Sequence, residues 1–292
     1  MPGQININKQ EHDEEWDLII SPSHNKVNIN LKEVWNYRDL IWMFMKRDFA
    51  AQYKQTILGP LWHIIQPLLT TLIFVVVFSN IADISTDGLP PVLFYLSGLT
   101  IWNYFSSCFQ TTSSVFVANA YIFGKVYFPR LVMPISIVVS NLVKFLIQFV
   151  LLIAVIVWYY VDGINISIGF SVLYIPLLLI MMAGISLGMG IIISSLTTKY
   201  RDFTVLVTFG VQLLMYATPV VYPLSMVQNK SLKYWLSLNP LTPVVESFRS
   251  VLLGTGSIDV SSLFYSSVFM LFTLLIGLVM FNRVERTFMD TV

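Results

Sequence analysis

The sequence has 292 residues, of which 56% are hydrophobic and only 11% are charged, and its 17 lysines and arginines nearly balance its 16 acidic residues. This composition excludes a water-soluble domain, and the lack of a basic tract beyond the membrane flanks gives no indication of nucleic-acid binding. Cys108 is the single cysteine, which excludes an internal disulfide and a cysteine metal motif.

The first part of the chain is polar and then becomes amphipathic. Residues 1–30 contain the acidic run EHDEEWD and are expected to be a flexible cytoplasmic tail. Residues 31–57 are expected to form one helix in the cytoplasmic membrane interface, because apolar side chains recur at helical spacing at Val34, Tyr37, Ile41, Phe44 and Met45.

Residues 58–292 are expected to form a membrane domain. A helix needs about 20 apolar residues to cross about 30 Å of hydrocarbon, and stretches this long without alternating polarity can satisfy their backbone groups only as helices. The sequence therefore predicts an all-α integral membrane protein with six spans, at 59–82, 92–117, 132–160, 170–196, 203–222 and 263–282.

The distribution of basic residues predicts the orientation, because lysine and arginine concentrate on the cytoplasmic side. One side has only Lys230, Lys233 and Arg249. The side of both termini has Lys46, Arg47, Lys54, Lys125, Arg130, Lys199, Arg201, Arg283 and Arg286. Both termini are therefore expected in the cytoplasm of a multi-pass protein of the cytoplasmic (inner) membrane.

Residues 223–262 are expected to form two short re-entrant or interfacial helices on the outer side. In the second, Thr242 is the expected amino-terminal cap and Gly254 the carboxy-terminal cap, which gives about 11 residues and about 16 Å, too short to span. Glu246 and Arg249 are three residues apart, so we expect them to share a polar face toward the exit and to pair.

Three further positions have open interpretations. The spacing of Gly184 and Gly188 favours close helix packing within the bundle over dimerisation. Lys144 is the only ionisable residue deep inside a span, where it is either functional or extends its amine toward the cytoplasm. His63 is interpreted as a packing or interfacial residue rather than a ligand.

The sequence lacks the residue patterns of a catalytic site and of an ATP-binding site. No cluster of carboxylates, histidines or cysteines predicts a catalytic or metal site. Gly124-Lys125 is the only Gly-Lys pair, and it lacks the flanking residues of a phosphate-binding loop. No cofactor is expected in this chain.

Five segments in order resemble the polysaccharide-exporting permeases of the type-2 ABC transporters. They are KRDFAAQYKQTILGPLWHIIQPLLTTLIFVVVFSNIA (46–82), GLTIWNYFSSCF (98–109), NAYIFGKVYFPRLVMPIS (119–136), KYRDFTVLVTFGVQLLMYATPVVYP (199–223) and SLNPLTPVVESFRSVLLG (237–254). The resemblance covers nearly everything after residue 35.

The resemblance implies a homodimer with two separate ATP-binding subunits, which bind the ATP and magnesium, and a lipid-linked polysaccharide as substrate. The positions that match the family's ATPase-contacting segments are Lys46, Arg47, Asp48, Lys125, Val126, Tyr127, Phe128, Pro129 and Arg130. The resemblance is to permeases that export O-antigen, capsule or teichoic acid.

Aromatic side chains agree with a sugar pathway, because rings offer flat faces to sugar C–H groups. We expect some of Trp102, Tyr104, Phe105, Tyr216 and Tyr222 to line the path, and Glu246 and Arg249 to lie at its outer gate. The function predicted is the permease subunit of an O-antigen exporter. The alternatives are a type-2 permease for teichoic acid, capsule, lipid or drug, and, in another class, a membrane-embedded glycan-processing enzyme.

Overall fold

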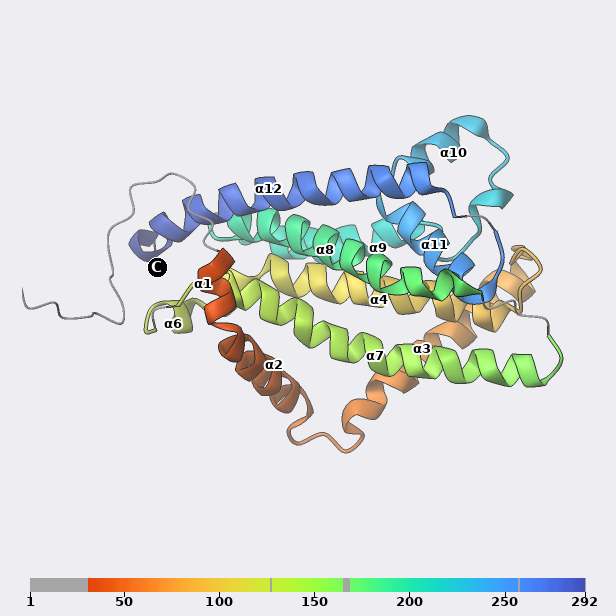
Figure 1. The fold of residues 1–292 in the computed structure, drawn as a ribbon, viewed down its shortest axis with the longest axis horizontal. Helices are drawn as coiled ribbons and strands as arrows, with labels where there is room; N and C mark the ends of the chain where they lie inside the picture. The colour runs from red at the N-terminus through yellow and green to blue at the C-terminus, as the bar shows by residue number, and fades with distance from the viewer. Residues whose placement is uncertain (1–30, 127, 165–168, 257, 292) are drawn as a thin grey trace, which may run out of the picture.

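The computed structural model describes residues 31–126, 128–164, 169–256 and 258–291, and these residues form helices with no strand among them. Long helices lie side by side in one bundle (Figure 1). The prediction of an all-α chain is therefore confirmed for this part, whereas the predicted tail at 1–30 lies outside it.

The expected interface helix forms as two helices, α1 (Leu31–Asn36) and α2 (Arg38–Tyr53). The prediction of one continuous helix over 31–57 was wrong, because Tyr37 leaves helical geometry (φ −93°, ψ 21°) and α2 ends at Tyr53. Phe44 and Met45 are buried, as the spacing predicted, while Trp35 and Trp42 are exposed.

Four segments are long and apolar enough to cross a membrane among the residues described. They are Gly59–Ile81, Val132–Val161, Phe170–Thr197 and Val260–Val284. The first contains η1 (Gly59–Leu61), α3 (Trp62–Phe74) and the π-helix η2 (Val75–Ile81), the second is α7, the third contains η3 (Phe170–Tyr174) and α8 (Ile175–Thr197), and the last lies in α12 (Val260–Thr291).

The two other predicted spans form α4 (Pro91–Ser113) and α9 (Phe203–Tyr216). α4 is the centre of the bundle, since it contacts α3, α7, α8, α9 and α11 (Leu241–Leu253). α9 has only 14 residues and ends before the predicted limit at residue 222. Thr218 precedes Pro219, and a proline disfavours helical geometry in the residue before it.

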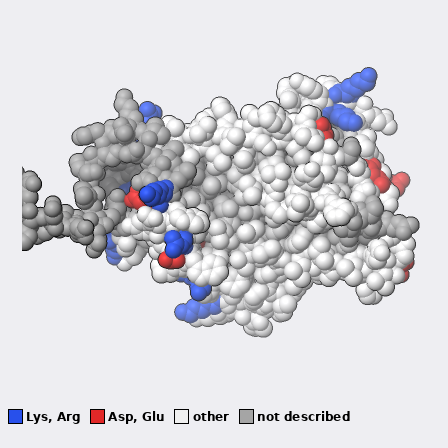
Figure 2. All heavy atoms as spheres, in the orientation of Figure 1, with Lys and Arg blue, Asp and Glu red and all other residues white. Residues whose placement is uncertain are grey.

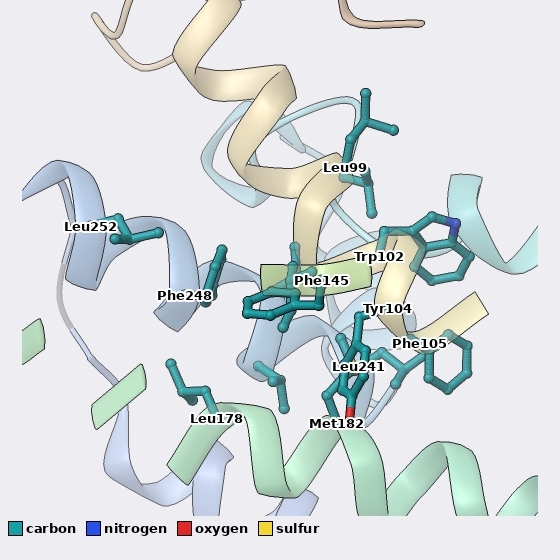
Figure 3. Close-up of a cluster of buried hydrophobic side chains, with 14 of the residues drawn as sticks. Leu99, Trp102, Tyr104, Phe105, Phe145, Leu178, Met182, Leu241, Phe248 and Leu252 are labelled. Atoms are coloured by element: carbon teal, nitrogen blue, oxygen red, sulfur yellow. The ribbon is translucent and has the colours of Figure 1, made fainter. Parts of the chain in front are cut away.

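The main hydrophobic core lies between α4, α7, α8 and α11 (Leu241–Leu253). Figure 3 shows Tyr104, Phe145 and Phe248 meeting there, and the Tyr104 and Phe145 rings are 5.5 Å apart. A second core lies at the end of the bundle near α1, and we call it the α2–α6 core. It includes Phe44, Phe128 of the loop before α7, and residues from α5 (Val115–Ala118), α6 (Ala120–Phe123), α7, α8 and α12. The residues from these helices include Phe116, Phe123, Val132, Ile191 and Phe281.

Helices α8 and α12 pack closely through glycines. A Cβ on Gly188 would lie 2.8 Å from the Leu274 nitrogen of α12, and one on Gly184 would lie 2.4 Å from the Met270 sulfur. The prediction that these glycines serve packing within the bundle is confirmed. Small residues bring membrane helices together because dispersion contacts, not hydrophobic exclusion, drive their association.

Charged side chains on the visible face gather at the two ends of the bundle, and the surface between them is uncharged (Figure 2). Large apolar side chains such as Leu72, Val150, Phe209 and Leu275 are exposed between those ends. An uncharged apolar belt of this kind is the surface that a bilayer requires.

Candidate functional site

Helix α10 (Lys230–Ser237) lies at one end of the bundle (Figure 1), and Lys233 of this helix lines a cavity of about 470 Å³. The cavity is formed by the loop before α4, the start of α4, the segment after α9, helices α10 and α11, and the loop after α11. Its lining residues are Asp87, Leu89, Phe94, Pro223, Leu224, Ser225, Lys233, Glu246, Arg249, Ser250, Thr255 and Gly256. We call it the end cavity.

Helix α11 forms one wall of the end cavity and is held at both ends. At its start, Asn239 Oδ1 accepts a hydrogen bond from the Leu241 nitrogen (3.0 Å), and Asn239 Nδ2 donates to the Ala217 carbonyl (3.0 Å). At its end, Gly254 has a φ of +71°, a conformation that glycine adopts without a Cβ clash. The 13 residues are about 20 Å long, too short to span.

Two details of the predicted helix were wrong. Thr242 is not the cap, since its hydroxyl donates to the Leu236 carbonyl (2.8 Å) and the helix already begins at Leu241. The predicted polar face is not free toward an exit either, because Ser247 and Arg249 are buried along with the apolar face. α11 packs against α4, α8 and α12 and so lies inside the bundle.

Arg249 is 6% exposed and is bonded to backbone rather than to a carboxylate. Its Nη2 donates to the carbonyls of Pro219 (3.1 Å) and Val220 (3.2 Å), and its guanidinium carbon lies 3.7 Å from the centre of the Phe94 ring. Burial lowers the pKa of Arg249 to about 10, so the group stays charged at neutral pH. Arg249 therefore joins α11 to α4 and to the segment after α9.

Glu246 lies on the same wall but forms no ion pair with Arg249 within the described residues. The predicted pairing was wrong: Glu246 Oε1 accepts a hydrogen bond from the Leu224 nitrogen (3.2 Å). Burial raises the pKa of the Glu246 carboxyl above its ordinary value. The two residues thus anchor different parts of the segment 219–224, and both line the end cavity.

Sequence reasoning missed two residues of this site. Phe94 supplies the ring under Arg249, and Gly98 supplies the space, since a Cβ there would lie 2.8 Å from Arg249 Nη2. Both lie one turn apart on α4. The glycine within an apolar span is the signal that could have indicated a close approach.

The expected path aromatics separate into two groups. Trp102, Tyr104 and Phe105 are buried in the main core, as Figure 3 shows. Tyr216 is 53% exposed at the end of α9, and Tyr222 donates a hydrogen bond to the Tyr216 carbonyl (2.9 Å). Of these five side chains, only that of Tyr216 is exposed.

The two segments expected to contact an ATPase meet in the α2–α6 core. Phe44 of α2 and Phe128 of the loop before α7 are both buried, with ring centres 5.7 Å apart. Above Phe44, Arg47 lies 4.7 Å from the ring centre and pairs with Asp48 (2.7 Å).

The remaining residues of these segments surround that core. Lys46 lies over the Trp42 ring at 5.3 Å, the Lys125 amine contacts the Tyr121 hydroxyl, and Val126 is exposed. The Pro129 carbonyl accepts from the Val132 nitrogen (2.9 Å), and Arg130 lies over the Phe123 ring at 5.8 Å. Tyr127 lies outside the described residues.

Over the residues described, no three His, Cys, Asp or Glu side chains come together in a way that could hold a metal ion. The charged groups of the end cavity bind backbone or flank the opening. These features define an all-helical, multi-pass membrane protein with a buried cation anchoring a short helix between its long ones.

The chain belongs to the ABC-2 type transporter family, because residues 39–253 match that family. Curated relatives agree. An O-antigen export system permease protein of Klebsiella pneumoniae, RfbA, is 30% identical over 253 residues, which is 86% of this chain and 94% of that protein. RfbA of Myxococcus xanthus is 27% identical over 226 residues, 76% of this chain and 83% of that protein. The polysialic acid transport protein KpsM of Escherichia coli is 25% identical over 250 residues, 84% and 93% of the two chains.

Proposed function

We propose that this chain is the permease subunit of an ATP-driven exporter that moves lipid-linked polysaccharide, of the O-antigen kind, across the cytoplasmic membrane. The observation that carries the proposal is the similarity to RfbA over nearly its whole length. The relatives named for O-antigen export share 27% or 30% identity with this chain, against 25% for the polysialic acid transport protein.

The proposal includes a topology of six spans with both termini in the cytoplasm and an inner-membrane location. α4 has 23 residues, about 34 Å, which is long enough to cross. α9 is about 21 Å long, so the non-helical residues that follow it complete the fifth crossing. α11 and α10 then lie on the outer side, and residues 58–292 form one membrane domain behind the interface helices.

The proposal also includes partners. Two copies of the chain form the exporter with two copies of a separate ATP-binding subunit, which supplies the ATP and magnesium. The α2–α6 core supports this, because it joins α2 to the loop before α7. The exposed side chains of Lys46, Arg47 and Val126 belong to these two segments. The exposed apolar faces of α3 and α9 support a second copy, and Tyr216 lies on such a face.

Export should depend on the ATP-binding partner. Membrane vesicles that contain this chain, its ATP-binding subunit and a lipid-linked polysaccharide are expected to move the polymer when ATP is added, and vesicles without the partner are expected to move none. The amount of polymer that a glycosidase can cleave on the far side measures the transfer. In the same assay, Tyr216→Ala is expected to slow transfer without lowering the amount of dimer, because the change removes a ring face that contacts the polymer.

Two results would contradict the proposed function. Transfer by the chain without the partner would contradict the ATP-driven assignment. Formation of glycosidic bonds by the isolated chain would place it in the enzyme class instead.

A cysteine at Ser250 tests the proposed topology. Ser250 lines the end cavity, and the single native cysteine, Cys108, is fully buried, so it gives little background. A membrane-impermeant maleimide added outside intact cells is expected to label Ser250→Cys and not the parent chain. Labelling only after the cytoplasmic side is opened would invert the topology. Lys199→Cys is the matched control. Lys199 follows the end of α8 on the proposed cytoplasmic side, so the maleimide added outside is expected not to label it.

A further inference from the structure

A second cavity, of about 310 Å³, lies inside the bundle between α3, α4 and α7, and neither the fold nor the end cavity accounts for it. Its lining is polar for a site bordered by three apolar helices: Gln52, His63, Gln66, Pro67, Asn103, Tyr104, Ser106, Ser107, Asn141, Lys144, Phe145 and Gln148. We call it the Lys144 cavity. Figure 1 shows α2 and α3 beside α7, the helix that carries Lys144.

Lys144 is the only lysine or arginine in that lining, and Asp48, the carboxylate that interacts with it electrostatically, lies outside the Lys144 cavity. It lies about 18 Å along α7 from Val132, well inside the span. Within the described residues Lys144 forms no ion pair, and no Asp or Glu lines this cavity. A lysine at this depth is costly in a membrane unless water, an anion or a partner compensates its charge.

The other polar groups of the cavity supply donors that are not used elsewhere. His63 Nε2 is buried without a hydrogen-bond partner. Asn103 Nδ2 donates to Gln148 Oε1 (3.3 Å), which leaves the Gln148 amide hydrogens directed to no described acceptor. Gln52 and Gln66 add two more amides. A buried polar group without a partner is unfavourable, so a set of them around an unpaired cation indicates a bound polar species.

A smaller cavity of about 150 Å³ continues this polar region toward the interface helix α2. It shares Gln52, Asn141 and Lys144 with the Lys144 cavity and adds Asp48, Phe49, Thr111, Ile137 and Ser140. Ser140 Oγ is also buried without a partner. The only carboxylate here, Asp48, is already paired with Arg47 (2.7 Å). The polar region therefore extends from α2 into the membrane, and its carboxylate forms its ion pair with Arg47 rather than with Lys144.

We propose that the Lys144 cavity binds a phosphate-class oxyanion on a lipid, with Lys144 supplying the charge and His63 and Gln148 supplying hydrogen bonds. Phosphate oxygens accept several hydrogen bonds and carry the charge that the lining lacks. Under the proposed function, on which this part rests, the source is the phosphate of the polyprenyl carrier; the headgroup of an ordinary phospholipid has the same chemistry. The snorkelling interpretation of Lys144 does not explain the polar groups gathered around it.

Binding of undecaprenyl phosphate to the purified full-length chain in detergent, followed by native mass spectrometry, tests the site. Lys144→Met keeps the length of the side chain and removes the charge, and it is expected to weaken binding about tenfold, since hydrogen bonds to charged groups are among the strongest. Lys144→Arg and the control Lys199→Met, a lysine outside the cavity, should bind within about twofold of the parent chain. Undecaprenol, which has no phosphate, should bind weakly and equally to all four proteins.

Two results would overturn the site: equal affinity of the parent and Lys144→Met chains for undecaprenyl phosphate, or undecaprenol binding as tightly as its phosphate. Competition with dioleoylphosphatidylglycerol distinguishes the sources, because equal displacement by this lipid assigns the site to phospholipid headgroups in general. Thermal unfolding of each variant shows that it is folded. The measurement needs no ATP-binding partner, so failure of ATP-driven export would contradict the proposed function and leave this result standing.

Discussion

Replacing Arg249 with methionine is expected to lower the stability of the folded chain by about 3 kcal/mol. The change removes charged hydrogen bonds to the Pro219 and Val220 carbonyls, worth roughly 1.5–3 kcal/mol each, and the desolvated contact with the Phe94 ring, worth about 2 kcal/mol. The loss of the desolvation penalty of a buried cation offsets part of this. Thermal unfolding in detergent, followed by size-exclusion chromatography with fluorescence detection, measures the change.

The control for Arg249→Met is Lys233→Met, because Lys233 lines the same cavity but is exposed. Its effect should stay within about 0.5 kcal/mol. Gly98→Ala provides an independent test without touching the charge, since its Cβ would lie 2.8 Å from Arg249 Nη2 and 3.0 Å from the Val220 carbonyl oxygen. If both Arg249→Met and Gly98→Ala unfold at the temperature of the parent chain, Arg249 is not the anchor described here.

Alanine at Gly188 is expected to destabilise the chain by about 1–3 kcal/mol, because an added methyl group in a closely packed contact forces the helices apart. The new Cβ would lie 2.8 Å from two backbone atoms of α12, and backbone cannot move aside as a flexible side chain does. The same thermal unfolding assay applies.

Gly210→Ala is the matched control for Gly188→Ala. Gly210 also lies within a membrane helix, α9, but a Cβ there would meet nothing within 4 Å. Alanine favours helix over glycine by roughly 0.8–1 kcal/mol, so this variant should be as stable as the parent chain or slightly more so. Equal losses for Gly188→Ala and Gly210→Ala would contradict this explanation, because Gly210 has no close neighbour and helix propensity favours alanine.

The apolar stretches were sufficient to place the long helices, because length and hydropathy are local properties of the chain. The helical spacing of Gly184 and Gly188 also predicted a close helix contact. The partner of a buried polar group cannot be read in this way. Arg249 is bonded to carbonyls 29 and 30 residues earlier in the chain, so the nearby Glu246 misled the sequence interpretation.

Burial of aromatic residues was equally hard to predict. Trp102 and Phe105 belong to a helix that is surrounded by other helices, whereas Tyr216 belongs to one at the periphery. Each of these residues lies in an apolar stretch of similar composition, so hydropathy alone gives the same prediction for all of them. Their different surroundings depend on contacts with α3, α7, α8 and α11, which are distant in sequence.

The α2–α6 core has a mechanical consequence. Phe44, Phe128 and Phe281 lie on three separate parts of the chain, yet they belong to one buried cluster that also includes the start of α7. Close-packed interiors transmit strain because they leave little free volume. A displacement of α2 is therefore expected to move the loop before α7 with it, and the reverse also holds. Because α7 and α12 contribute to the same cluster, both helices receive that displacement together.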